Sequence, residues 1–297
     1  MKTIRTVRSM TAWSERLRRE GVTIGFVPTM GALHDGHRSL IRAARLCCDA
    51  LVVSIFVNPT QFGPTEDFTT YPRPIARDRA LCREEGVDVC FEPTARAMYP
   101  GGFQTTVTVP TLARRWEGEI RPHHFAGVAT VVTKLFGIVR PNRALFGQKD
   151  YQQAALVKRL VIDLNLGVTI NVRPTIREQD GLAMSSRNRY LSPEDRRAST
   201  ILYQALQAGR QAIEAGRKAV PTVEQIMRQT VEQEPTARIE YLALCDPESL
   251  EPLGQVDRRT LLLGAIRIGS VRLIDKMVVT ASNRMRRSRT APVTRER

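Results

Sequence analysis

The feature that most constrains the fold of this 297-residue chain is the alternation of strand-like and helix-like segments in its first half. The runs VTIGFV (22–27) and ALVVSIFV (50–57) are apolar and rich in β-branched residues, as expected for strands buried on both faces. Between them, Leu40, Ile41 and Ala44 recur at the spacing of an amphipathic helix. A strand, a helix and a second strand in this order predict a βαβ unit and therefore parallel strands.

The alternation continues along the chain. The segment 74–85 has a helical pattern and precedes a strand-like run at 86–93. Two further helical patterns, at 127–139 and 150–166, flank a short strand at 143–147. We therefore predict the α/β class, with a Rossmann-like parallel sheet covered by helices.

The pattern changes near residue 180. Ser192 is a predicted N-cap and Pro193 stands at the first position of one long amphipathic helix, predicted over 192–216. A second helix (222–234) and strands at 238–245, 260–268 and 271–280 follow. Helices grouped ahead of strands indicate a smaller α+β domain, so we predict domains at 1–178 and 179–283 and a basic tail at 284–297.

The chain carries a net charge of +15, from 45 basic and 30 acidic side chains. This balance favours anionic partners such as nucleic acid, nucleotides or phosphorylated metabolites. Residues 284–297 contain six arginines and one glutamate and supply +5 of the charge, which leaves +10 elsewhere. We predict that this tail is a solvated, disordered end, with nucleic-acid affinity as the alternative.

No apolar run reaches the roughly 20 residues of a membrane span, and the N-terminus has no apolar stretch of the signal-peptide type. We therefore expect a soluble, cytoplasmic protein. The five cysteines are odd in number and include no CxxC pair. We expect them to be small buried apolar residues and not a disulfide framework or a zinc site.

The stretch PTMGALHDGH (28–37) holds two of the four histidines and joins the first buried strand to its helix. Ligands of open parallel sheets bind beyond the C-terminal ends of the strands, and a helix N-terminus offers free amide groups and partial positive charge. Gly31 and Gly36 permit close backbone approach, and His34 and His37 add imidazole donors. The residues favour a phosphate-binding loop; the alternatives are two surface histidines or a zinc site with no evident third ligand.

Three further segments carry polar side chains at comparable positions. FGQKDYQQ (146–153) follows a strand and starts a helix, AMSSRN (183–188) combines two hydroxyls with an arginine, and FVNPTQFG (56–63) ends a strand with two amide side chains. Taken singly, they are also compatible with a helix cap, a domain linker and a turn. Their joint placement at the mouth of the predicted sheet favours one binding site.

These motifs resemble those of the pantothenate synthetase (pantoate–β-alanine ligase) family, within the nucleotidyltransferase superfamily that carries HIGH-type motifs. The resemblance runs from about residue 3 to residue 280 and leaves out the tail. It rests on six motifs in sequence order: PTMGALHDGH, VSIFVNPTQFG, YPR, RPHHFAGV, FGQKDYQQ and GLAMSSRN.

The resemblance implies a cytoplasmic, homodimeric ligase of pantothenate biosynthesis that joins D-pantoate to β-alanine. In the family, the pantoate carboxylate attacks the α-phosphate of ATP to give pantoyl adenylate and pyrophosphate, and β-alanine then displaces AMP. ATP enters as a substrate with Mg²⁺, and no tightly bound organic cofactor, membrane or specific nucleic-acid partner is implied. The domain at 1–178 would bind nucleotide and pantoate and form the dimer, and that at 179–283 would act as a lid.

The site residues of the family carry over motif by motif. His34, His37 and Lys149 are implied as catalytic, with His37 as the proton donor. The implied ATP site consists of Met30, Gly31, Ala32, Leu33, His34, Asp35, Gly36, His37, Gly147, Gln148, Lys149, Asp150, Ile176, Met184, Ser185, Ser186 and Arg187. The implied site for pantoate and β-alanine consists of Asn58, Gln61, Arg121, His124 and Gln153.

Two positions depart from the family pattern. Thr60 stands where the family usually has methionine, which predicts a loss of apolar packing on pantoate. Arg77 precedes Asp78 where the family tends to have two adjacent acidic residues. This leaves Asp78 alone as a candidate Mg²⁺ ligand, and the phosphates of ATP can hold most of the metal themselves.

Two other functions stay open at this point. One is a cytidylyltransferase-like enzyme acting on a phosphorylated alcohol, which would give no reason for Asn58, Gln61 and Gln153. The other is an RNA-binding protein that uses the basic face and tail. Against it stand an aromatic content of only 6% and the lack of a basic–aromatic stacking pattern.

Overall fold

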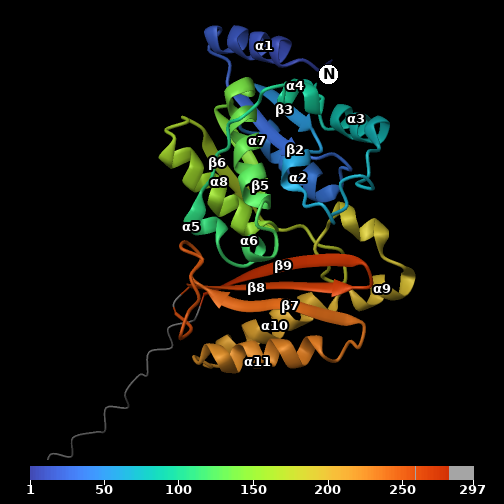
Figure 1. Cartoon of the computed structure of the whole chain (residues 1–297), viewed down its shortest axis with the longest axis vertical. Helices are drawn as coiled ribbons and strands as arrows, with labels where there is room; N and C mark the ends of the chain where they lie inside the picture. Colours follow the sequence, from blue (N-terminus) through green and yellow to red (C-terminus); the bar gives the residue numbers. More distant parts are fainter. Residues whose placement is uncertain (258, 281–297) are drawn as a thin grey trace, which may run out of the picture.

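The computed structural model describes residues 1–257 and 259–280, so the predicted tail at 284–297 lies outside the described residues. Six parallel strands form the larger of its two sheets (Figure 1). They are β1 (Lys2–Ile4), β2 (Ile24–Thr29), β3 (Ala50–Ile55), β4 (Val89–Phe91), β5 (Arg143–Gly147) and β6 (Thr169–Arg173). Their order is β1-β4-β3-β2-β5-β6, which is a Rossmann-like order around β2 with β1 added at one edge.

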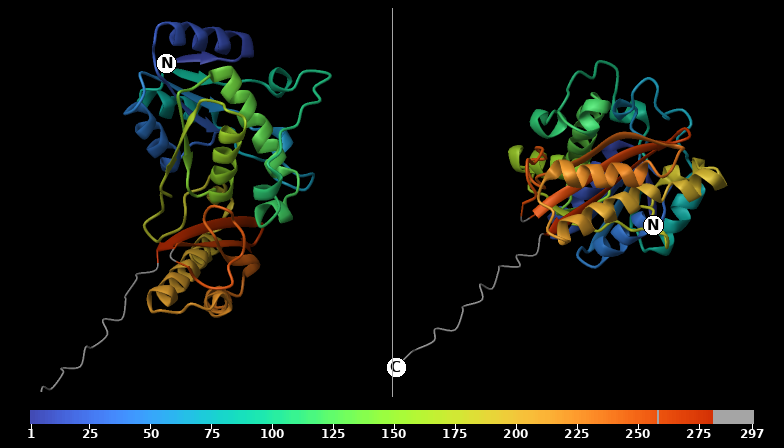
Figure 2. Two further views of the ribbon diagram at one scale, coloured as in Figure 1. Left: turned by 90° about the vertical axis from the view of Figure 1, so that its left-hand side faces the viewer. Right: turned by 90° about the horizontal axis from the view of Figure 1, so that it is seen from below.

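Helices cover both faces of this sheet, which confirms the predicted α/β class. The helices are α1 (Val7–Arg19), α2 (Asp35–Arg45), α3 (Ile75–Glu84), α7 (His124–Val139) and α8 (Tyr151–Asp163). Successive residues of β2 face opposite sides: Phe26 packs with residues of α1 and α7, whereas Val27 packs with residues of α2 and α3. The left view of Figure 2 shows α2 and α7 on opposite sides of the strands.

Short helical turns lie in the loops at the carboxyl end of the sheet and beside it. They are the 3₁₀ turns η1 (Pro59–Gln61) and η2 (Ser186–Tyr190) and the helices α4 (Ala95–Met98), α5 (Pro110–Ala113) and α6 (Glu117–Ile120). The side chain of Asn58 accepts a hydrogen bond from the backbone of Thr60 and so caps η1, and Ser185 caps η2 in the same way.

A three-stranded antiparallel sheet follows, formed by β7 (Ala237–Cys245), β8 (Arg259–Ile268) and β9 (Val271–Thr280). One face of it is covered by α10 (Ile201–Glu214) and α11 (Val220–Val231), and α9 (Pro193–Ala198) precedes them. The other face turns toward the larger sheet, so Figure 1 shows the small sheet between α10 and α11 on one side and α5, α6 and α8 on the other.

The single long helix predicted over 192–216 is wrong, because the chain forms α9 and α10 with a break between them. The hydroxyl groups of Ser199 and Thr200 donate hydrogen bonds to the carbonyls of Arg196 and Arg197, and the chain turns at this point. Such local side-chain bonds compete with helix continuation. Ser192 caps α9 as predicted.

Two other expectations differ from the structure. Cys47 is exposed, whereas the other four cysteines are buried, so the expectation of five buried cysteines is wrong for this residue. The elements β1, α1 and β6 were not predicted. The three-residue β1 is too short to show a period, and β6 lies at the sheet edge with neither face fully buried.

The segment 174–186 packs into both parts of the molecule, so the division into 1–178 and 179–283 stays a prediction. Arg177 pairs with Asp275 of β9, and the Ser186 hydroxyl donates to the carbonyl oxygen of Ala32, 3.0 Å away. Among the described residues, none of the helices combines the length and apolar character of a membrane span.

Candidate functional site

The connections from β2 to α2 and from β5 to α8 lie side by side at the carboxyl end of the sheet, because β2 and β5 are neighbours where the strand order reverses. A cavity of about 1060 Å³ lies between this edge and β9 of the small sheet. It is lined by most of the predicted ATP residues: Met30, His34, Gly36, His37, Gly147, Lys149, Asp150, Ile176, Met184, Ser185, Ser186 and Arg187. All five residues predicted for pantoate and β-alanine line it too: Asn58, Gln61, Arg121, His124 and Gln153.

Five residues of the predicted ATP set do not line the cavity: Gly31, Ala32, Leu33, Asp35 and Gln148. Ala32 and Leu33 are buried, and their backbone amides donate to the two carboxylate oxygens of Asp78, each at 2.8 Å. Two of the amide groups that we expected to be free for phosphate therefore brace the loop instead. Both Ala32 and Gly31 have positive φ, of 51° and 86°, which the brace holds in place.

Asp78 does not fit the predicted role of a Mg²⁺ ligand. Its side chain is 1% exposed, and each of its oxygens accepts a backbone N–H. Burial raises the pKa of Asp78 against the lowering effect of these bonds. No group of three or more His, Cys, Asp or Glu residues within 1–257 and 259–280 is placed to hold a metal ion.

The two histidines form a reciprocal cap at the start of α2. Nδ1 of His34 accepts from the amide of Gly36 at 3.1 Å, and Nδ1 of His37 accepts from the amide of His34 at 3.3 Å. Burial, and then the charge of Lys149, lowers the pKa of His34 to about 4. Burial, and then the neighbouring His34, lowers the pKa of His37 to about 3. Both rings are therefore neutral at pH 7, and each carries its proton on Nε2 as a hydrogen-bond donor.

The β5–α8 loop faces the histidines across the switch point. Asp150 is the N-cap residue of α8 but makes no side-chain cap bond, and its Oδ1 lies 3.6 Å from Nζ of Lys149. The amide of Gln148 donates to the carbonyl of Arg173 at 2.8 Å and so ties the loop to the end of β6. This arrangement directs Lys149 and Asp150 into the cavity.

An amide-rich floor lies at the end of β3. The Asn58 amide donates to Oε1 of Gln61 at 3.1 Å and to the carbonyl of Gly127 at 3.2 Å, and its oxygen accepts from the hydroxyl of Tyr99 at 2.7 Å. Asn58 thus uses both amide hydrogens inside the protein, which argues against the predicted direct contact with substrate. Its observed contacts orient Gln61, whose Nε2 lies 3.2 Å from Sδ of Met30.

Thr60 does not create the predicted loss of packing in the cavity. It is exposed, it does not line the cavity, and its hydroxyl donates to Oδ1 of Asn58 at 3.0 Å. Its backbone lies close against Gly127 of α7, where an added Cβ would clash with the Thr60 carbonyl oxygen and approach the Gln61 amide nitrogen to 2.6 Å. The backbone of the floor therefore packs directly against the backbone of α7.

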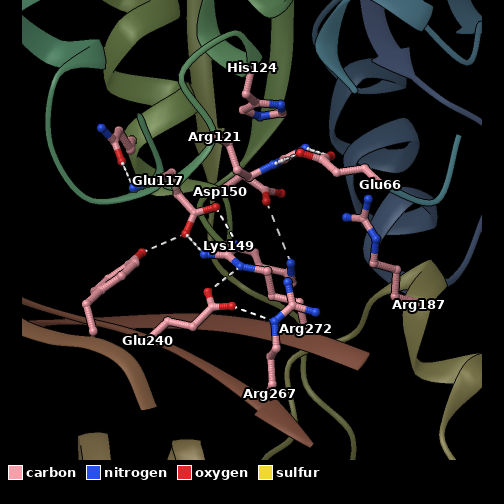
Figure 3. A network of polar contacts seen from close by, with 12 residues as sticks. Glu66, Glu117, Arg121, His124, Lys149, Asp150, Arg187, Glu240, Arg267 and Arg272 are labelled. Atoms are coloured by element: carbon pink, nitrogen blue, oxygen red, sulfur yellow. Dashed lines mark hydrogen bonds and ion pairs between the residues drawn. The ribbon is translucent and has the colours of Figure 1, made fainter. Parts of the chain in front are cut away.

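Three arginines of the cavity wall are each paired with a carboxylate from another segment, and Figure 3 shows the pairs of Arg121 and Arg272. Arg121 binds Glu66, Arg187 binds Asp67, and Arg272 of β9 binds Glu117 of α6, all through two hydrogen bonds. Burial alone would raise the pKa of Glu117, but its hydrogen bonds with Arg272 bring the pKa below the usual range. Tyr241 and Glu240 of β7 extend this contact through Glu117 and Arg272.

Sequence reasoning placed Arg121 and Arg187 in the site but missed their partners and the whole Arg272–Glu117 contact. The paired residues stand 55, 120 and 155 positions apart in the chain. No local spacing joins such residues. The only available signal was the strand prediction over 271–280, which placed Arg272 on a strand without saying what it faces.

The fold and the cavity define a Rossmann-like nucleotide-binding protein with an HxGH loop and a lysine-bearing loop at the switch point. A model of the pantoate-beta-alanine ligase family matches residues 2–278. The chain is 52% identical over 279 residues to the pantothenate synthetase of Heliobacterium modesticaldum, covering 94% of this chain and 99% of that protein. The chain therefore belongs to the pantoate–β-alanine ligase family.

Solved structures agree with this assignment. A pantothenate synthetase from Thermus thermophilus has a TM-score of 0.89 at 46% identity, over 93% of this chain and 99% of that one. A pantoate-beta-alanine ligase from Francisella tularensis, complexed with beta-gamma ATP and beta-alanine, has a TM-score of 0.79 at 35% identity, over 94% and 97% of the two chains.

Proposed function

We propose that this protein catalyses the ATP-dependent condensation of D-pantoate with β-alanine to pantothenate, through pantoyl adenylate, with release of pyrophosphate and AMP. One observation carries the proposal. In a single cavity, side chains that can donate hydrogen bonds to phosphate, those of His34, His37 and Lys149, lie beside an amide-rich floor that includes Gln61 and Gln153. Family membership supports the same reaction.

The first step belongs to the histidine and lysine side of the cavity. A carboxylate oxygen of pantoate forms a bond to the α-phosphorus, and the bond from that phosphorus to the bridging oxygen of the β-phosphate breaks, so pyrophosphate leaves with the electron pair. The neutral Nε2–H groups of His34 and His37 and the ammonium of Lys149 would donate to the oxygens that gain charge. His37 would then act as a hydrogen-bond donor, since the low pKa of its ring argues against a cationic acid.

The second step belongs to the amide side. The amine of β-alanine attacks the pantoyl carbonyl carbon, the C–O bond to AMP breaks, and the nitrogen loses a proton as the amide forms. Gln153 lines the cavity. Its side chain makes no hydrogen bond with any described residue, so its amide is free to bind pantoate. Gln61 would contact both pantoate and β-alanine from the floor that Asn58 orients.

The metal and the assembly belong to the same proposal. Mg²⁺ would enter as part of the ATP substrate, held by the phosphates, because Asp78 is engaged by backbone amides. We further propose a cytoplasmic homodimer formed through the domain at 1–178, which the family resemblance supports. Sedimentation equilibrium checks the dimer, and a single species at 33.4 kDa would contradict it.

The most direct test measures pyrophosphate and AMP with each substrate left out in turn. ATP with pantoate alone should release one equivalent of pyrophosphate, should support pantoate-dependent exchange between ATP and pyrophosphate, and should release AMP only after β-alanine is added. Exchange that ignores pantoate and responds to a phosphorylated alcohol would mean a different nucleotidyltransferase.

A further inference from the structure

Two basic side chains on one face of β9 contact residues around the larger sheet. Arg272 and Lys276 are four residues apart, so they lie on the same side of the strand. Arg272 reaches Glu117 of α6, and the Lys276 ammonium donates to Oε1 of Gln148 at 2.8 Å. Gln148 belongs to the β5–α8 loop, next to Lys149.

The surroundings of Lys276 are unusual for a lysine. Its side chain is 6% exposed, and it does not line the cavity. Burial lowers the pKa of Lys276 to about 8, with Asp275 raising it and Arg177 lowering it further. A buried ammonium needs strong partners, and here the side-chain partner is a neutral amide oxygen. This contact therefore fixes the Gln148 side chain firmly toward β9.

Fixing Gln148 also fixes its neighbour. The backbone amide of Gln148 is held by Arg173 and its side chain by Lys276, so both ends of the residue are tied. Lys149 is the next residue and lines the cavity, whereas Gln148 does not line it. The two hydrogen bonds of Gln148 therefore restrict where the backbone of Lys149 can lie.

The adjacent Asp275 holds a second segment of the cavity wall, the one that contains Arg177. Its carboxylate accepts from both terminal nitrogens of Arg177, at 2.5 and 3.0 Å, and Arg177 also donates to the carbonyl of Gly181. Arg177 follows Ile176, which lines the cavity. The two adjacent residues of β9 thus hold the loop that carries Lys149 and the segment that carries Ile176, and neither has a hydrogen bond or ion pair with Asn58 or Gln61.

We propose that Lys276 is a positioning residue for ATP: its hydrogen bond to Gln148 holds the loop 147–150 in the arrangement in which Lys149 meets the phosphates. The inference rests on the proposed function for the identity of the nucleotide. It makes ATP affinity depend on the docking of β9, while pantoate affinity does not.

The test is calorimetric titration of the full-length chain with a non-hydrolysable ATP analogue and, separately, with pantoate. Lys276→Met keeps an unbranched side chain, one atom shorter, and removes the donor, and we expect it to weaken nucleotide binding about tenfold with little change for pantoate. Gln148→Ala should weaken it similarly, and the double variant should be no worse than either single variant, because the two residues act through one bond. Lys158→Met, at an exposed lysine of α8, is the matched control and should bind like the wild type.

Equal weakening for nucleotide and pantoate, or independent effects of the two substitutions that multiply in the double variant, would overturn the inference. Thermal unfolding reports whether Lys276→Met folds. If it does not, Gln148→Ala decides from the other side, because unchanged nucleotide affinity in that variant contradicts the role, and Lys276→Arg should retain most of the binding. A wild-type protein that binds the nucleotide but makes no pantothenate would refute the proposed function and leave these affinities to decide the inference.

Discussion

At the scale of single residues, the place of one proton on each histidine ring decides what the cavity offers a ligand. His34 and His37 both use Nδ1 to accept backbone amides, so both present Nε2–H. Neutral donors of this kind need no protonation before they bind phosphate, and they do not repel Lys149 as imidazolium ions would. The positive charge on this side of the cavity then comes from Lys149.

Lys149→Ala tests that division of labour. A preorganised donor at developing charge contributes about 100- to 1,000-fold in rate, so adenylate formation should slow by that factor. Aminolysis of supplied pantoyl adenylate should change far less, because pyrophosphate has left by then. Lys149→Arg should restore only part of the rate, since a planar guanidinium reaches differently. Single-turnover kinetics of each step provide the measurement, and equal losses in both steps would assign Lys149 a general structural role.

Gln153→Ala tests the amide side. Removing a hydrogen bond to a substrate hydroxyl in a closed site should raise the KM for pantoate about tenfold or more while the KM for ATP changes little. Gln211→Ala, at an exposed glutamine of α10, is the control. Steady-state kinetics with each substrate varied in turn give the answer, and parallel increases in both constants would exclude a pantoate-specific contact.

The histidines also predict how stability depends on pH. Burial, with a further contribution from Arg121, lowers the pKa of His124 to about 4, and the His34 and His37 rings titrate at about 4 and 3. A base with a depressed pKa in the folded state favours folding fully above the unfolded value of 6.5 and loses this contribution as pH falls toward the folded value. His124→Gln, which keeps a donor for the Gln61 carbonyl, should remove about 3 kcal/mol of the decline in unfolding free energy between pH 6.5 and 4. Urea unfolding across this range measures it, and an unchanged slope would contradict the assignment.

At the scale of elements, the contact between α7 and η1 places the amide floor. Gly127 lies against the backbone of Thr60 and Gln61, and its carbonyl accepts from Asn58. We therefore expect a displacement of the α7 backbone at Gly127 to move the backbone of Thr60 and Gln61 as well.

Two glycines of the same helix make the contact testable. Gly127→Ala would force a methyl group into the backbone of η1, so it should destabilise the fold by about 1–3 kcal/mol and raise the KM for pantoate. Gly137→Ala meets nothing within 4 Å and should stabilise the helix by up to about 1 kcal/mol. Opposite signs in thermal unfolding are expected, and a neutral Gly127→Ala variant would mean that the contact yields.

The sequence predicted those elements whose information is local. The runs that became β2 and β3 are buried on both faces and carry their signal in themselves, and the loops with His34 and Lys149 are contiguous motifs next to them. The sequence predicts Asn58 as a ligand contact, and its hydrogen bonds with Tyr99 and Gly127, 41 and 69 positions away, have no local pattern that could predict them. The hydrogen bonds of Asp78 leave no local pattern either, since the amides that it accepts from lie 45 and 46 positions earlier.

At the scale of the whole molecule, the charge of +15 is spread unevenly. Residues 284–297 lie outside the described residues and outside the family match, which ends at residue 278. The residues that line the cavity in the described part of the chain all lie between Pro28 and Asp275.

Deletion of residues 284–297 should therefore leave adenylate formation unchanged. The shortened chain loses six arginines, so its salt-sensitive retention on heparin or RNA should fall. Elution from a heparin column along a salt gradient, together with the pyrophosphate assay, checks both halves. A large fall in turnover with the fold intact would show that the tail reaches the site.

The three arginine–carboxylate pairs of the cavity wall have a consequence for how the protein attracts anions. Arg121, Arg187 and Arg272 already have counterions built into the chain, so the wall is neutral at these positions. An anion that turns one of these arginines toward itself must displace a carboxylate, and the exchange yields only the difference between two similar bonds. We therefore expect these three arginines to contribute little to anion binding while their carboxylate partners stay in place, which leaves the attraction of anions mainly to Lys149.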